Sequence, residues 1–255
     1  MADPQYWILK KLFPREPDIL TGEVYRGTSK LRVLLGDELL GRVRDKTVID
    51  FGCGKGQEAI ELARHGARRV IGVDIREDLL EQARQHAVQA KVDSICRFGR
   101  SADEKADVIV SLDSFEHFAD PAAILRTMAE LLKPQGEVLV SFGPTWYHPL
   151  GGHLFSVFPW AHLVFSERAL IRWRADFKSD GATRFHEVAG GLNGMTIRRF
   201  EKLVAESPLR AVEIESVPIR KLRPFHNRWT REFTTAIVRC RLRPNAILKR
   251  SVDAE

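Results

Sequence analysis

Short apolar runs alternate with amphipathic stretches through the middle of the chain. Five runs predict β-strands, at Thr47–Phe51, Arg69–Val73, Ser94–Phe98, Val108–Leu112 and Glu137–Phe142. Helical periodicity occupies the stretches between them, at Gln57–Arg64, Glu77–Gln89 and Pro121–Leu132. Alternation of this kind is typical of βα units, in which helices cover both faces of a parallel sheet. The expected fold class is therefore α/β, with a doubly wound, mostly parallel sheet.

The pattern changes on either side of this core. Residues 1–30 show no clear period, and the next helix is expected over Leu31–Val43. Residues 144–195 are rich in aromatic residues, Gly, His and Pro, with a helical stretch over Ala161–Trp173. A helix over Ile197–Glu206 and an antiparallel strand pair, Ala211–Ile219 and Phe233–Leu242, close the chain. We expect one domain, 1–255, divided into an N-terminal helical segment (1–44), a core (45–143), an inserted cap (144–195) and a closing helix and strand pair (196–242).

Composition adds few constraints to this picture. The 255 residues carry a formal charge of +6, and residues 196–255 hold 14 Lys and Arg against 7 Asp and Glu. A basic surface of this kind is either simply solvated or attracts phosphate groups, nucleic acid or an anionic membrane surface. No apolar run approaches the roughly 20 residues of a membrane span. The three scattered cysteines indicate neither disulfides nor a metal site, which suits a protein of the cytoplasm.

The most informative segment is the glycine-rich turn that follows the first predicted strand. Glycine lacks a Cβ and tolerates positive φ, so backbone there can approach a ligand closely, and the following helix directs free N–H groups at it. A phosphate-binding P-loop is excluded because no Gly-Lys-Ser/Thr follows. A dehydrogenase fingerprint fits poorly, because Gln57 stands where its third glycine belongs. The turn is Gly52-Cys53-Gly54-Lys55-Gly56.

Three further motifs accompany the turn in a fixed order. Asp74 closes the second strand, Asp113-Ser114-Phe115-Glu116-His117 follows the fourth, and Leu131-Leu132-Lys133-Pro134-Gln135-Gly136 precedes the fifth. With these motifs, residues 45–143 resemble a class I S-adenosylmethionine-dependent methyltransferase of the small-molecule branch that includes quinone-biosynthesis enzymes. The resemblance implies a seven-stranded sheet with an antiparallel closing strand, and an inserted helical and aromatic cap after strand 5.

The resemblance also implies roles for individual residues toward S-adenosylmethionine. Asp74 is expected to bind the ribose hydroxyls and Ile75 to pack against adenine, while Ser101 and Ala102 lie near the adenine amine. A larger set of residues is expected to contact the methionine part and the ribose of the cofactor: Asp50, Gly52, Cys53, Gly54, Gly56, Gln57, Asp113 and Ser114. Cys53 is expected to fit sterically rather than to act as a nucleophile.

Three histidines are candidates for removing a proton from the methyl acceptor, because the ordinary pKa of histidine lies near neutrality. His117 follows the fourth strand, where it either acts on the acceptor or orders the loop. His148 and His153 lie in the segment after the fifth strand, where they either act as bases or belong to plain loop structure. The aromatic residues of 144–165 either form an apolar pocket for the acceptor or a small core of the cap.

The favoured function is thus methyl transfer to a small apolar or aromatic acceptor, by in-line displacement at oxygen or carbon. A methyltransferase acting on nucleic acid or protein is the first alternative, and it is disfavoured. The fourth strand ends in Asp113-Ser114-Phe115 rather than in the Asn/Asp-Pro-Pro-aromatic signature of amine methylation. A cofactor-binding protein without turnover is the second alternative. The sequence leaves the acceptor open.

Overall fold

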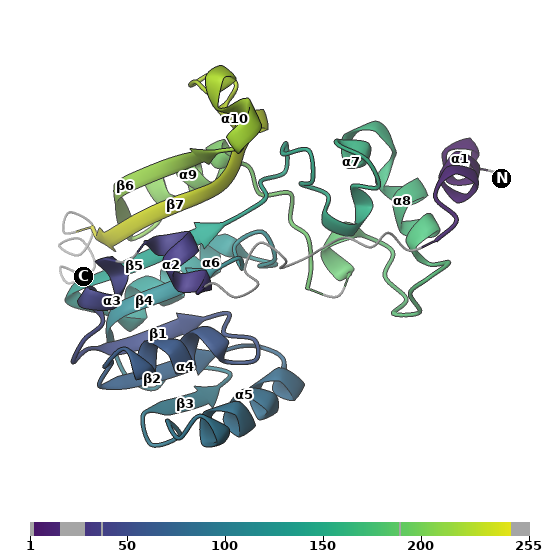
Figure 1. Ribbon diagram of the computed structural model, residues 1–255. Coiled ribbons are helices and arrows are strands. Elements are labelled where there is room, and N and C mark those ends of the chain that lie inside the picture. The colour runs from purple at the N-terminus through teal and green to yellow at the C-terminus, as the bar shows by residue number, and fades with distance from the viewer. Residues whose placement is uncertain (1–2, 16–28, 37, 189, 246–255) are drawn as a thin grey trace, which may run out of the picture.

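Seven strands form one twisted sheet in the order β3-β2-β1-β4-β5-β7-β6 (Figure 1). The computed structural model describes residues 3–15, 29–36, 38–188 and 190–245. The strands are β1 (Thr47–Phe51), β2 (Arg69–Val73), β3 (Cys96–Gly99), β4 (Ala106–Leu112), β5 (Leu132–Phe142), β6 (Leu209–Pro218) and β7 (Thr235–Pro244).

Strand directions confirm the expected fold class. β1 pairs in parallel with β2 and with β4, and β4 pairs in parallel with β5. β7 runs antiparallel to both of its neighbours, β5 and β6. The edge strand β3 pairs in parallel with β2, so five strands place their carboxyl ends together, beside the loops that carry the sequence motifs.

Helices cover both faces of the sheet, because its central strands are apolar on each side. One face packs against α2 (Lys30–Leu35), α4 (Gln57–Arg64) and α5 (Glu77–Gln89), with Leu34 and Leu62 fully buried. The other face packs against α6 (Pro121–Leu131) and α9 (Ile197–Ala205). On that second face Phe200 of α9 contacts Phe115 and Phe142, at ring-centroid distances of 5.3 and 4.8 Å.

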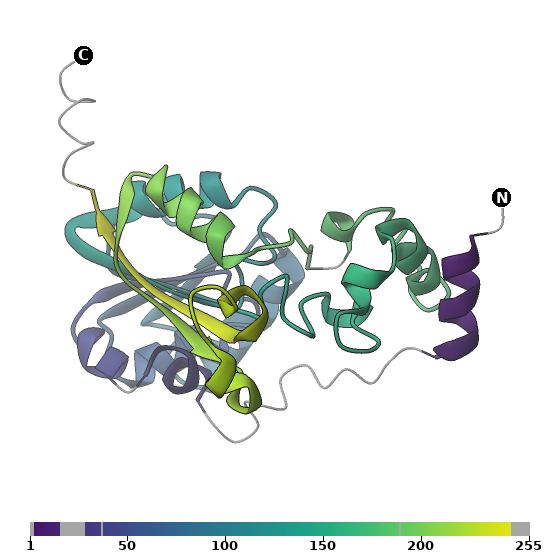
Figure 2. The same cartoon turned by 90° about the horizontal axis from the view of Figure 1, so that it is seen from above.

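The inserted cap lies to one side of the sheet and has its own core (Figure 2). It contains η2 (His153–Phe155), α7 (Ala161–Val164), α8 (Glu167–Arg174) and η3 (Phe185–Glu187). The N-terminal helix α1 (Pro4–Leu12) packs against α8, so the cap core combines residues distant in sequence: Tyr6, Leu9, Phe155, Leu170 and Trp173. In the described part of the chain, every helix is too short or too polar to cross a membrane.

Several predicted elements are interrupted or shifted. The helix expected over Leu31–Val43 is two short helices, α2 and α3 (Glu38–Arg42), because Gly36 adopts φ +84°. The stretch Ala161–Trp173 divides where the Ser166 side chain accepts from the Ala169 N–H and caps α8. Residues 1–30, which lack a clear period, nevertheless contain α1.

The closing strand pair is antiparallel as expected, with shifted ends. β6 begins at Leu209, and β7 begins at Thr235 rather than Phe233. Between the strands lie a 3₁₀ segment, η4 (Arg220–Phe225), and a single helical turn, α10 (Arg231–Thr234). Phe233 therefore belongs to the connection between the strands.

Replacing Phe200 should destabilise the fold strongly. Phe200→Ala removes a fully buried ring from the face of the sheet that carries α6 and α9, so the free energy of unfolding should fall by about 3–5 kcal/mol. Phe225→Ala is the matched control, because 66% of that residue is exposed. Denaturant unfolding measures both variants, and equal stabilities would contradict the packing described.

Candidate active site

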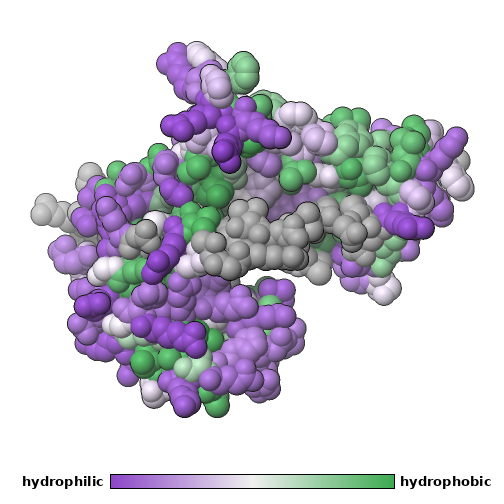
Figure 3. Space-filling model, in the orientation of Figure 1, coloured by the Kyte–Doolittle hydropathy of each residue, from purple (hydrophilic) through white to green (hydrophobic). Residues whose placement is uncertain are grey.

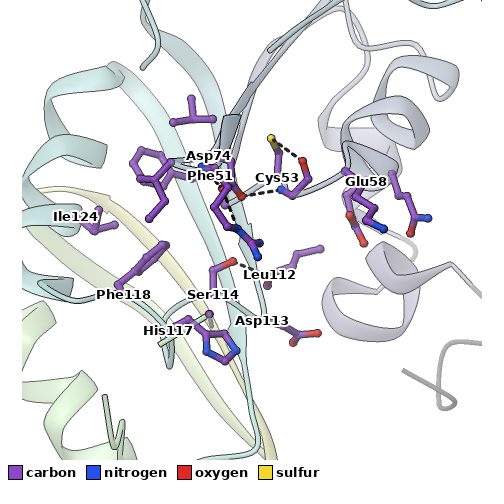
Figure 4. Close-up of a pocket in the computed structure, with 18 of the residues that line it drawn as sticks. Phe51, Cys53, Glu58, Asp74, Leu112, Asp113, Ser114, His117, Phe118 and Ile124 are labelled. Atoms are coloured by element: carbon purple, nitrogen blue, oxygen red, sulfur yellow. Dashed lines mark hydrogen bonds and ion pairs between the residues drawn. The ribbon is translucent and has the colours of Figure 1, made fainter. Parts of the chain in front are cut away.

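A cavity of about 510 Å³ opens where the carboxyl ends of β1, β2 and β4 meet (Figure 4). Three segments supply most of its wall: the turn after β1, the end of β2, and the stretch that follows β4. Ligands of open α/β sheets bind at this edge, outside the carboxyl ends of the strands. The cavity therefore lies where the motifs were expected to converge.

The glycine turn forms one wall with its backbone. Gly52 has φ +88°, and a Cβ there would lie 2.5 Å from the Ser114 Oγ, so a side chain would collide with the opposite wall. A Cβ on Gly54 would instead meet no atom within 4 Å. Gly56 (φ +75°) is the left-handed N-cap of α4, and its place among the side chains of Phe98 and Ala83 leaves no room for a Cβ. The turn is thus shaped to leave space beside Gly54.

Asp74 fixes the position of this turn. Its Oδ2 accepts from the Gly54 N–H at 2.9 Å, and its Oδ1 accepts from the Arg76 N–H at 2.9 Å. The Arg76 guanidinium lies 3.5 Å from the same carboxylate. Only 8% of Asp74 is exposed, and it nevertheless lines the cavity. One carboxylate therefore joins the ends of β1 and β2 and faces the space between them.

Asp50 lies inside β1, beneath the cavity rather than in its wall. It is buried, and its Oδ2 has no hydrogen-bond partner. Burial raises the pKa of this carboxyl, and the nearby Glu58 carboxylate raises it further. A buried acceptor without a partner is rare, and such groups concentrate at functional sites.

Asp113 occupies the opposite wall in a strained conformation. This residue follows β4 and has φ +46°, a backbone conformation that residues other than glycine seldom adopt. Its carboxylate lies 3.1 Å from the Lys30 ammonium, which also lies 3.8 Å from Glu58. Burial disfavours the charged ammonium, but the two carboxylates outweigh it and raise the pKa of Lys30.

Two histidines meet at the edge of the cavity. The rings of His117 and His153 lie 5.2 Å apart, edge to face. The His117 Nδ1 lies 2.8 Å from the Gly191 carbonyl oxygen, which can only accept, so Nδ1 carries the proton and Nε2 is free to accept. Burial lowers the pKa of both rings, and that of His153 to about 4, so both are neutral at physiological pH.

Glu116 completes this group from the segment after β4. Its Oε1 accepts from the Gly143 N–H at 3.3 Å, while its buried Oε2 and the Nε2 of His153 have no partner. Burial and the Asp113 carboxylate raise the pKa of Glu116 to about 8, so it is largely protonated at neutral pH. The ligand atoms of Glu116, His117 and His153 lie within 4.8 Å of one another, close enough to hold a divalent cation together.

The predicted site residues divide into two sets. Those that line the cavity are Gly52, Cys53, Gly54, Gln57, Asp74, Ile75, Asp113, Ser114 and His117. Those outside its lining are Asp50, Gly56, Ser101, Ala102, His148 and His153. His148 uses its Nδ1 to accept from the Leu150 N–H within its own loop. Arg100 lines the cavity in the place expected for Ser101 and Ala102.

Sequence reasoning missed part of the wall. The missed residues include Lys30, Glu58, Arg76, Phe118 and Ile124. A signal existed for Glu58, Arg76 and Phe118, because each lies within a few residues of a motif. The sequence contains no signal for Lys30, because the segment that contains it reaches the site only through the tertiary fold.

Comparison with known proteins agrees with this geometry. A family model described as a methyltransferase domain matches residues 26–189. The chain is 36% identical over 107 residues to the ubiquinone biosynthesis O-methyltransferase of Serratia proteamaculans, covering 40% of this chain and 44% of that protein. It is 41% identical over 106 residues to the Neisseria meningitidis enzyme of the same name, covering 39% and 44%. The chain thus spans less than half the length of these curated relatives.

Solved structures share the fold at low sequence identity. Magnesium protoporphyrin IX methyltransferase from Synechocystis aligns with a TM-score of 0.54 at 18% identity, covering 93% of this chain and 92% of that one. Geranyl diphosphate C-methyltransferase from Streptomyces coelicolor aligns with a TM-score of 0.54 at 16% identity, covering 82% and 76%. With a family model matching more than half of its length, this chain belongs to the family of S-adenosylmethionine-dependent methyltransferase domains.

Proposed function

We propose that this enzyme methylates an oxygen or carbon of a small apolar or aromatic acceptor. The observation that carries the proposal is a neutral histidine, His117, which lines the cavity with Nε2 free to accept a proton. The curated relatives are named O-methyltransferases of ubiquinone biosynthesis, which supports a hydroxyl acceptor. A hydroxyl must lose its proton as it is methylated, and a positioned base serves that step.

The cavity wall has the features that an adenosine-type cofactor needs. Asp74 has lone pairs left for ribose hydroxyls after its two backbone hydrogen bonds. The open space beside Gly54 admits a ligand against bare backbone, and Ile75, which is 79% exposed, offers an apolar surface in the same wall. When bound, S-adenosylmethionine supplies a methyl group on a positively charged sulfur, which suits an in-line displacement. The Asp113 carboxylate favours positive charge at this end of the cavity.

The acceptor is expected on the side of the cavity that faces the histidines. Phe118 and Ile124 line that side and give it an apolar surface. The aromatic residues of the loop after β5 lie outside the lining of the cavity, and Trp146 and Phe155 pack in the cap core instead. An apolar wall with a few directed polar groups is typical of sites for small organic molecules.

The proton of the acceptor is expected to pass to the His117 Nε2. His117 has the required tautomer because the Gly191 carbonyl holds its Nδ1–H. His153 packs against its ring edge to face and limits its rotation. The main task of the enzyme is nevertheless to hold the acceptor in line with the methyl group, because alignment alone supplies several kcal/mol of the barrier.

Asp74→Ala should weaken S-adenosylmethionine binding at least about tenfold, since a hydrogen bond to a charged group contributes roughly 1.5–3 kcal/mol. The variant also releases the Gly54 N–H that shapes the turn. Asp78→Ala is the control, because Asp78 is exposed in the first turn of α5. Calorimetric titration compares the two, and equal affinities would remove Asp74 from the cofactor site.

His117→Gln should lower kcat by about 100-fold to 10,000-fold, the usual contribution of a positioned base. Binding of S-adenosylmethionine should change little, and His65→Gln at the end of α4 should leave kcat unaltered. His153→Gln should lower kcat to a smaller extent, and His148→Gln least, because His148 is engaged within its own loop.

Chelation distinguishes between two possible roles of Glu116, His117 and His153, which are proton transfer and binding of a divalent cation. Single-turnover rates measured with and without EDTA should agree if Glu116, His117 and His153 handle a proton. Loss of activity with EDTA and its recovery with Mn²⁺ or Zn²⁺ would assign the three residues to a cation instead. Unchanged kcat in both His117→Gln and His153→Gln would remove the proposed base.

Phenols bearing alkyl chains of increasing length should become better acceptors. Each buried methylene contributes about 0.8 kcal/mol, so kcat/KM should rise about fourfold per methylene until the apolar wall is filled. Transfer of an isotopically labelled methyl group measures the series. Labelling confined to RNA or to protein in a cell extract would favour the alternative acceptors instead.

A further inference from the structure

The connection between β6 and β7 is a basic surface segment. Residues 219–233 are called here the β6–β7 protrusion, and they project beyond the sheet around α10 (Figure 1). From Ser216 to Arg231 the sequence contains four Arg and one Lys and no acidic residue. Figure 3 shows the same region at the top of the molecule, where most of the surface is hydrophilic.

Four of its five cations are exposed and available. Arg231 is the exception, since it lies 2.6 Å from the Glu201 carboxylate. Among the described residues, no carboxylate lies within ion-pair distance of the other four: Arg220, Lys221, Arg223 and Arg228. Concentrated positive charge of this kind is not neutralised within the described part of the chain.

Two large apolar side chains lie among these cations. Phe225 is 66% exposed and Trp229 is 71% exposed. The turn that presents them is held by its own hydrogen bonds, because the Asn227 Oδ1 accepts from the Trp229 N–H at 2.8 Å. The Thr230 hydroxyl donates to the Phe225 carbonyl at 2.5 Å. Both side chains are therefore exposed by a well-defined turn.

The base of the protrusion is joined to the body of the enzyme. Glu232 accepts from the N–H groups of Ile197 and Arg198, at 3.1 and 2.9 Å, at the N-terminus of α9. The Phe233 ring lies 5.2 Å from the Tyr147 ring, in the loop between β5 and the candidate base His153. These contacts fix the protrusion to α9 and to the loop after β5, next to the candidate active site.

We propose that the β6–β7 protrusion docks on an anionic phospholipid membrane. Cations near such a surface are attracted by its negative potential, while Trp and Phe insert at the level of the lipid headgroups. Charge complementarity and exposed apolar rings on one turn match this environment. A nucleic acid fits less well, because the Arg228 guanidinium already covers the Trp229 ring, 4.3 Å from its centroid, where a base would stack.

Vesicle co-sedimentation tests the proposal with phosphatidylcholine vesicles, with and without phosphatidylglycerol. The native protein should sediment with the phosphatidylglycerol vesicles, and less so as salt rises. Binding should fall at least about tenfold in a variant that replaces the four cations with Gln, since the anionic surface attracts each of them. The double variant Phe225→Ala/Trp229→Ala should also bind less, while its dependence on salt remains. A control replaces four exposed arginines elsewhere with Gln: Arg44, Arg64, Arg97 and Arg126.

The outcomes separate docking from a change in overall charge or fold. Retained S-adenosylmethionine binding in each variant establishes that the fold is intact, and this readout does not depend on which acceptor is methylated. Equal loss in the protrusion and control variants would overturn the proposal, because net charge would then explain binding. Absence of vesicle binding by the native protein would also overturn it. Salt-sensitive association with tRNA but not with vesicles would assign the surface to nucleic acid.

Discussion

The carboxylate of Asp74 is the contact on which the active site depends. It accepts hydrogen bonds from backbone N–H groups in two loops, one after β1 and one after β2. Hydrogen bonds to a charged acceptor are stronger than those between neutral groups, so the carboxylate holds both loops in place. Together with the N–H groups of Gly52 and Cys53, which donate to the Val73 carbonyl, this bridge fixes the space beside Gly54, into which the cofactor is proposed to fit. The same residue thus shapes the turn and presents oxygen atoms to the cavity.

Much of the fold could be predicted because it follows from local patterns. Each central strand is buried on both faces, so it appears in the sequence as an uninterrupted apolar run, as in Val48-Ile49 and Val108-Ile109-Val110. The helix predicted to start at Pro121 does start there, as α6, and the Asp120 side chain caps it by accepting from the Ala123 N–H. The order of the motifs then predicted which strand ends would meet.

The remaining features depend on contacts between residues distant in sequence. The Gly191 carbonyl selects the tautomer of His117 across 74 positions, and no pattern near either residue indicates that pairing. The contact of His117 with His153 likewise joins the stretch after β4 to the cap segment that follows β5. The ends of two helices were predicted wrongly for a different reason. Gly36 and Ser166 are weak local signals for a helix end, and the apolar periodicity continues past both of them.

The N-terminal part of the chain contacts both the cap and the cavity wall. The α1 C-cap residue Phe13 accepts the Trp173 indole N–H at 2.8 Å, which ties the start of the chain to the cap core. The same part of the chain then supplies Lys30, paired with Asp113 in the cavity wall. Two segments near the start of the chain therefore serve two parts of the molecule: α1 completes the core of the cap, and Lys30 sets part of the charge of the cavity wall.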